Sequence, residues 1–128
     1  MRLGLVLAYA GRGEEGIPYM KKALRLNPFP SHNYFSNFGI IYRESGHYEK
    51  AIEVSKKALE SEPNAQIPYI TLAISYIRLG REEEARAAAA EILRINPKFS
   101  VSRYAKVIPF TQPLVDRIVE DLRKAGLK

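Results

Sequence analysis

The amino-acid sequence predicts an all-α fold, a right-handed superhelix built from helical hairpins with a capping helix at the C-terminal end. Three similar segments end in proline, at Pro28, Pro63 and Pro97, so the steps between them are 35 and 34 residues. Glycine keeps the same two steps at Gly11, Gly46 and Gly80. A fixed period of this length is typical of stacked hairpins, which present a surface, so it favours binding over catalysis.

Each unit is expected to begin with a helix that pairs a large apolar residue with a small one, which lets a neighbouring helix approach closely. These pairs are Leu3-Gly4, Phe38-Gly39 and Leu72-Ala73. The recurring glycines are placed to end these helices in a left-handed conformation. In the second helix of each unit, a small residue recurs at Gly16, Ala51 and Ala85. The prolines then stop that helix and turn the chain into the next unit.

The period breaks after Pro97. Residues 100–107 are predicted to form a short helix, and a longer one is predicted from Thr111, as its N-cap, to Gly126, as its stop. Its apolar stripe comprises Leu114, Ile118 and Leu122, with Val115 and Val119 beside them, and its polar side includes Asp116, Glu120 and Asp121. We expect this helix to cap the array by packing on the second helix of the third unit, at Ala85, Ala88 and Ala89.

The repeating pattern resembles the tetratricopeptide repeat (TPR) family, whose unit is a helix–turn–helix of about 34 residues. The second unit matches the family's pattern at Phe35, Gly39, Tyr42, Ala51, Ala58 and Pro63, and the third at Tyr69, Leu72, Tyr76, Ala85 and Pro97. The resemblance implies one domain over residues 1–128. It would hold a truncated first repeat at 1–28, repeats at 29–63 and 64–97, and the short and capping helices at 98–128.

Composition points away from several classes of protein. The net charge of +6 comes from 20 basic and 14 acidic residues, and no basic stripe is interleaved with aromatic residues, so nucleic acid is not the expected partner. No apolar run approaches the roughly 18 residues of a membrane helix, so no membrane partner is expected. The chain has no cysteine, which agrees with a cytoplasmic location.

The chain carries no recognisable catalytic or metal-binding motif. Its only histidines are His32 and His47, and no carboxylate pair is placed to complete a metal site with them. Glycines occur singly and never form a phosphate-binding loop. We therefore expect a protein that is not an enzyme and that uses no cofactor or metal.

The TPR resemblance implies a concave groove lined by the first helix of each unit. The groove residues would be Leu5, Tyr9, Asn33, Asn37, Ile40, Arg43, Ile67, Ile70, Thr71, Ile74 and Arg78. The family's carboxylate clamp is not expected, since only Asn37 matches it, while Leu5, Ile67 and Thr71 replace other clamp residues. An isoleucine-rich wall beside two asparagines suits an apolar or amphipathic helix or an extended segment. Alternatively, Ile67 and Ile70 only pack against the neighbouring unit.

These observations favour a non-catalytic protein-interaction module, a scaffold within a bacterial cytoplasmic protein, which binds a protein or peptide segment in the groove. The tail, with Pro109-Phe110 and residues 122–127, is similar to the segment that closes the repeats of some bacterial signalling proteins, including class III adenylate and guanylate cyclases. The alternative is therefore a regulatory or oligomerising C-terminal tail of a nucleotide cyclase. Because the truncated first repeat leaves Leu3, Val6 and Leu7 without a partner, it predicts a homodimer through that end.

Overall fold

The computed structural model describes residues 2–28 and 31–128, and within these ranges its regular structure is entirely helical. The helices are α1 (Arg2–Tyr9), α2 (Gly13–Leu26), α3 (His32–Glu44), α4 (Tyr48–Ser61), α5 (Gln66–Arg78), α6 (Glu82–Ile95), α7 (Val101–Val107) and α8 (Gln112–Lys124). None of these helices is long and apolar enough to cross a bilayer.

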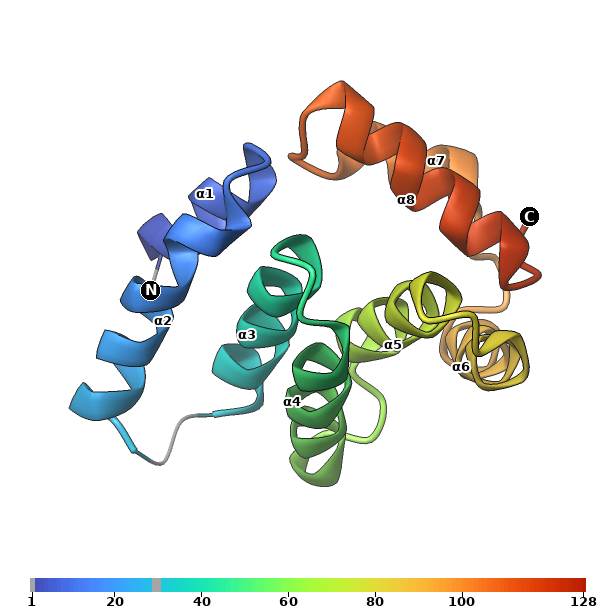
Figure 1. The fold of residues 1–128 in the computed structure, drawn as a ribbon. Coiled ribbons are helices and arrows are strands. Elements are labelled where there is room, and N and C mark those ends of the chain that lie inside the picture. Colours follow the sequence, from blue (N-terminus) through green and yellow to red (C-terminus); the bar gives the residue numbers. More distant parts are fainter. Residues whose placement is uncertain (1, 29–30) are drawn as a thin grey trace.

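The first six helices form an α–α solenoid of three hairpins, α1–α2, α3–α4 and α5–α6 (Figure 1). Consecutive hairpins are in contact, because α2 packs on α3 and α4 packs on α5. The glycine that follows the first helix of each hairpin has a positive φ, at 81° for Gly11, 84° for Gly46 and 76° for Gly80. This confirms the left-handed turns predicted from the sequence.

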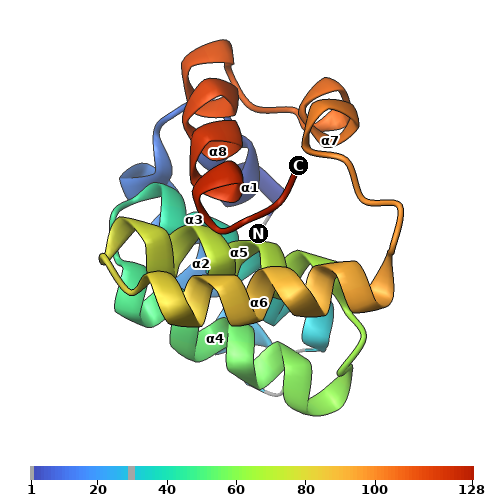
Figure 2. The ribbon, with the colours of Figure 1, turned by 90° about the vertical axis from the view of Figure 1, so that its right-hand side faces the viewer.

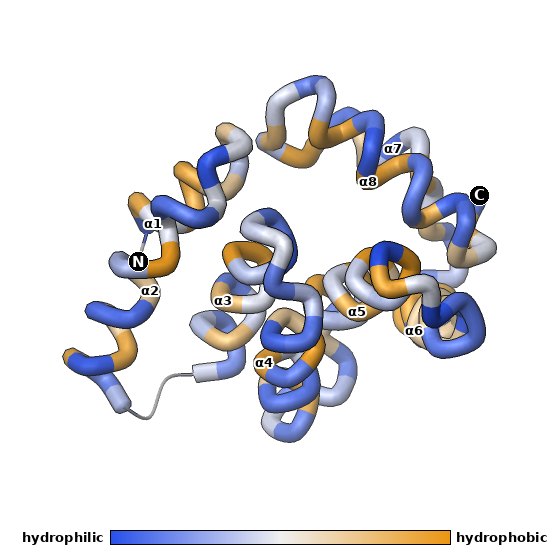
Figure 3. Tube along the Cα trace, viewed as in Figure 1, coloured by the Kyte–Doolittle hydropathy of each residue, from blue (hydrophilic) through white to orange (hydrophobic). Residues whose placement is uncertain are grey.

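The apolar core has two parts. One lies between the first two hairpins and contains Ala8, Met20 and Ile41. The other surrounds α5 and includes Ile74 and Ile118, both fully buried. Apolar and polar stretches alternate along the helices in Figure 3, as expected for helices that bury one face.

The last helix begins and ends where predicted, with Gly126 at a φ of 102°. Thr111 occupies the N-cap position, but its side chain makes no capping hydrogen bond. The expected docking surface on α6 was wrong, because α8 packs mainly on α5 and on α7 (Figure 2). The reason lies in α5, whose residues 70–76 are all buried. A helix that is buried on all sides must pack against more than one other helix. In this structure α6 packs on one side of α5, and α8 packs on another.

A close contact between α1 and α2 makes one substitution unusually informative. A Cβ atom on Gly16 would lie only 2.6 Å from the carbonyl oxygen of Gly4. The corresponding positions of the later hairpins carry Ala51 and Ala85, which are fully buried. Helix propensity alone would make Gly16→Ala stabilising by up to about 1 kcal/mol. We expect the opposite, because overpacking costs about 1–3 kcal/mol.

Urea denaturation of Gly16→Ala should therefore show a lower midpoint than the unchanged chain. The exposed Lys22 on the same helix provides a control, since Lys22→Ala should leave the midpoint nearly unchanged. A Gly16→Ala chain with an equal or higher midpoint would contradict the proposed tight contact between α1 and α2.

Candidate functional site

The concave face of the solenoid is partly occupied by the chain's own C-terminal segment. Besides packing on α5, this segment reaches the first hairpin, where the backbone N–H of Thr111 donates to the carbonyl oxygen of Tyr9 at 3.1 Å. The rings of Tyr9 and Phe110 meet edge to face with centroids 4.8 Å apart. The guanidinium of Arg43 lies over the Phe110 ring, 5.5 Å from its centroid. The segment therefore bridges all three hairpins.

This arrangement divides the groove residues predicted from the sequence into two sets. The first set has buried side chains and comprises Ile40, Arg43, Ile70, Thr71, Ile74 and Arg78. The second set is accessible: Asn33 and Ile67 are exposed, and Leu5, Tyr9 and Asn37 are half-buried. The role of either set in binding stays a prediction. Burial, however, places the first set in the packed interior, where Arg78 also contacts α8 through Asp121.

A network of four charged side chains lies where α3, α5 and α8 meet. Arg78 donates from Nε to Asp121 Oδ2 at 2.8 Å and from Nη1 to Glu44 Oε2 at 3.3 Å. Arg43 donates to the same Glu44 oxygen at 2.9 Å and to Thr71 Oγ1 at 3.3 Å. The four ionic side chains are only 1–8 % exposed. Two positive and two negative charges balance in a place that water barely reaches.

The pKa of Arg78 reflects both its burial and its two carboxylate partners. Burial alone would lower the pKa of Arg78, but the charges of Glu44 and Asp121 outweigh it and raise that pKa above its usual value. The guanidinium therefore stays charged and needs its carboxylates. One of its nitrogens, Nη2, is buried without a hydrogen-bond partner among the described residues.

Sequence reasoning placed Asp121 on the polar side of the last helix, and this was wrong, because the residue is 6 % exposed. A signal was available, since Ile118, Asp121, Leu122 and Ala125 follow the i, i+3, i+4, i+7 spacing of one helical face.

Removing the Asp121 carboxylate should strongly destabilise the protein. Asp121→Ala leaves Arg78 with a buried, only partly compensated charge, and losing one member of a buried pair typically costs about 3–5 kcal/mol. Urea denaturation should show this loss, whereas Glu120→Ala, at an exposed position of the same helix, should change the midpoint little.

A second variant distinguishes the effect of the unpaired Arg78 charge from the effect of lost side-chain packing. The double substitution Arg78→Met with Asp121→Leu removes both charges of that pair and should recover much of the lost stability. Equal destabilisation by Asp121→Ala and by the exposed control would contradict the importance of the network.

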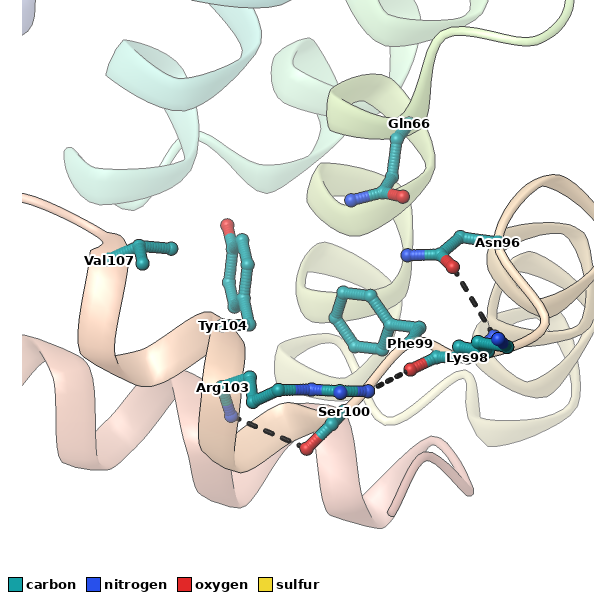
Figure 4. A pocket seen from close by; sticks show the side chains of 8 residues that line it. All are labelled: Gln66, Asn96, Lys98, Phe99, Ser100, Arg103, Tyr104 and Val107. Carbon is teal, nitrogen blue, oxygen red and sulfur yellow. Dashed lines mark hydrogen bonds between the residues drawn. The ribbon is translucent and has the colours of Figure 1, made fainter.

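The concave side also holds an open hollow of about 410 Å³, between the start of α5, the α6–α7 connection and α7 (Figure 4). Its lining residues are Gln66, Asn96, Lys98, Phe99, Ser100, Arg103, Tyr104 and Val107. The rings of Phe99 and Tyr104 lie 5.5 Å apart at a tilt of 43°. Two aromatic rings thus form an apolar wall beside several hydrogen-bonding groups.

Several polar groups of the hollow are available to a ligand. Within the described part of the chain, neither the Tyr104 hydroxyl nor the Gln66 side chain has a hydrogen-bond partner. Burial raises the pKa of Tyr104 against the opposing effect of Arg43, so the hydroxyl remains a donor at neutral pH. Sequence reasoning missed this site, because it falls where the repeat period ends. The only signal was the pair of aromatic residues at positions 99 and 104.

Family comparison agrees with the helical hairpins. A family model described as tetratricopeptide repeat matches residues 42–108, and another with the same description matches residues 1–61. The chain belongs to the tetratricopeptide repeat family. TPR domains are typically protein-binding and non-catalytic, and no group of three or more acidic or histidine residues in the described part of the chain is arranged to hold a metal ion.

Similar proteins are much longer than this TPR chain. TPR repeat-containing protein YpiA of Bacillus subtilis is 32% identical over 93 residues, 73% of this chain and 22% of that protein. Putative adenylate cyclase 3 of Rhizobium meliloti is 46% identical over 44 residues, 34% of this chain and 8% of that protein. Protein O-mannosyl-transferase TMTC2 of Homo sapiens is 38% identical over 61 residues, 45% of this chain and 7% of that protein. The chain thus spans less than a quarter of each relative.

Proposed function

We propose that this TPR domain is a protein-interaction module that holds a segment of a partner protein at the open part of its concave face. The observation that supports this most directly is the hollow beside α7, which is lined both by aromatic rings and by unpartnered amide and hydroxyl groups. Its volume of about 410 Å³ is in the usual range of ligand pockets, about 300–1,000 Å³.

The chemistry of the hollow suits a short extended segment. The Gln66 side chain both donates and accepts hydrogen bonds, which matches the amide groups of a peptide backbone. The exposed Ile67 follows it in α5, and Asn33 is exposed near the start of α3. In this proposal Asn33, Asn37 and Ile67 contact the partner, while the buried groove residues keep the face rigid. Ile70 and Ile74 are buried, so in this proposal they do not contact the partner and α8 stays in place.

We further propose that the parent protein is a cytoplasmic scaffold or signalling protein of a bacterium. Two of the three relatives named above are bacterial, from Rhizobium meliloti and Bacillus subtilis, and this supports a bacterial origin. The absence of cysteine agrees with a reducing compartment.

Photo-crosslinking tests where the partner binds. A photoreactive phenylalanine at position 67 should crosslink a protein from a lysate of the source organism, because Ile67 is 47 % exposed and follows Gln66, which lines the hollow. Leu93 on α6 is a matched control, since it is apolar and 41 % exposed outside the concave face. Adding Tyr104→Ala should remove the adduct formed at position 67. Equal adducts from both positions, or none from position 67, would contradict this location.

Self-association as the oligomerising tail of a nucleotide cyclase is the second candidate, and a separate surface favours it. On the outer flank of the first hairpin, Leu3, Val6 and Tyr19 are 49, 51 and 40 % exposed. Apolar surface of this kind is commonly covered by another element or another chain. The similarity to putative adenylate cyclase 3 adds the link to cyclases.

Analytical ultracentrifugation tests the proposed homodimer. The unchanged chain should sediment as a dimer at high micromolar concentration, and Leu3→Glu with Val6→Glu should sediment as a monomer, because the charges would have to be buried in the interface. Val107→Glu, at a residue 77 % exposed on α7, is the control and should remain dimeric. A monomeric unchanged chain would exclude self-association through this flank.

A further inference from the structure

The hollow beside α7 has an unbalanced positive charge. Lys98 and Arg103 line it, and none of its lining residues in the described part of the chain is acidic. Neither cation forms an ion pair with a described residue. The sequence explains this, because residues 92–115 contain four basic residues and no acidic one. The hollow therefore presents two cationic side chains, and no carboxylate among its lining residues neutralises them.

Four exposed arginines of the hairpins differ from Arg103. Each is matched by a glutamate three or four residues away, in the pairs Arg12–Glu15, Arg81–Glu84, Arg86–Glu82 and Arg94–Glu91. Such pairs neutralise each other along one helix. Arg103 instead donates from Nη2 to the carbonyl oxygen of Lys98, which holds its guanidinium at the edge of the hollow (Figure 4). The remaining guanidinium N–H groups are free to donate to a carboxylate.

The aromatic wall specifies a second feature of the ligand. Phe99 and Tyr104 offer ring surface next to the two cations. An apolar side chain of a ligand gains from covering these rings. The Tyr104 hydroxyl and the Gln66 amide add hydrogen bonds to the ligand backbone. One site thus combines attraction for negative charge with an apolar contact.

We propose that the hollow binds an acidic segment of a partner protein, in which a carboxylate contacts Lys98 and Arg103 and a neighbouring apolar side chain packs on Phe99 and Tyr104. This inference rests on the proposed function and specifies its partner. The site is built from the α6–α7 connection, α7 and Gln66 at the start of α5. None of the family's clamp positions, Leu5, Asn37, Ile67 and Thr71, is among its lining residues, although Ile67 follows Gln66 in the chain. A protein is favoured over nucleic acid because the hollow has two cations and one pair of rings rather than a continuous basic track.

Selection from an unbiased library of random dodecamer peptides on phage tests this proposal with the full chain. The enriched peptides should carry aspartate or glutamate next to an apolar residue. Reversing both charges, with Lys98→Glu and Arg103→Glu, should weaken their binding about tenfold or more, as expected for loss of charge-assisted contacts. Lys21→Glu with Lys22→Glu is the matched control, because these exposed lysines of α2 lie outside the hollow, and binding should persist.

Two further variants show whether weaker binding reflects the lost charge or a misfolded chain. Lys98→Gln with Arg103→Gln removes the charges without reversing them and should also weaken binding, whereas Arg103→Lys keeps the charge and should retain much of it. Circular dichroism of each variant checks that the helices are unchanged. The affinity for acidic peptides should also fall as salt concentration rises.

Each contrary outcome has a distinct meaning. Enriched peptides that lack acidic residues, or that bind the charge-reversed chain equally, overturn the acidic preference. If Tyr104→Ala still abolishes their binding, the proposed function stands. A library that yields no peptide above background overturns both proposals. If a short oligouridine RNA binds more tightly than the peptides, and this binding depends on Lys98 and Arg103, the hollow is a nucleic-acid site and the proposal of a protein partner is overturned.

Discussion

The architecture depends on the buried contact between Arg78 and Asp121. It joins α8 to α5, and through Glu44 it also fixes both helices to α3. A guanidinium in this position is tolerated only while its carboxylates stay in place, because an unpaired charge would cost several kcal/mol. A shift of α8 by one residue would turn Asp121 away from Arg78. The charge network therefore specifies the register of the helix, while Ile118 and Leu122 supply the apolar burial.

The location of the candidate site follows from that register. With α8 fixed on α5, the preceding Phe110 and Thr111 lie against Tyr9. The short α7 is then held beside the start of α5, at a distance that leaves the hollow between them (Figure 4). The concave face of this TPR domain is therefore narrower than the face formed by its first helices alone. Its accessible part is made from residues of both the repeats and the tail.

Local features of the fold were predictable from the sequence, and long-range ones were not. The turns at Gly11, Gly46 and Gly80 depend on backbone conformations that glycine adopts readily, so their positions followed from the repeat. The docking of α8 depended on the second apolar side of α5, which the hairpin pattern does not reveal. The role of Asp121 was hidden because a charged residue is ordinarily exposed. The hollow was missed because residues 98–107 belong to no repeat, so no aligned position indicates their role.

The contact between Tyr9 and the segment at Phe110–Thr111 changes how the molecule is expected to unfold. In an open repeat array each unit contacts only its neighbours, so the ends fray independently of each other. Here α1 also contacts the segment that precedes α8, so the first hairpin is linked directly to the C-terminal helices. Local unfolding of α1 would remove contacts from the segment before α8, and unfolding of that segment would remove contacts from α1. We therefore expect α1 and α8 to unfold as one cooperative unit. Amide hydrogen exchange should accordingly give both helices a similar opening free energy, and widely different values would show that this link is weak.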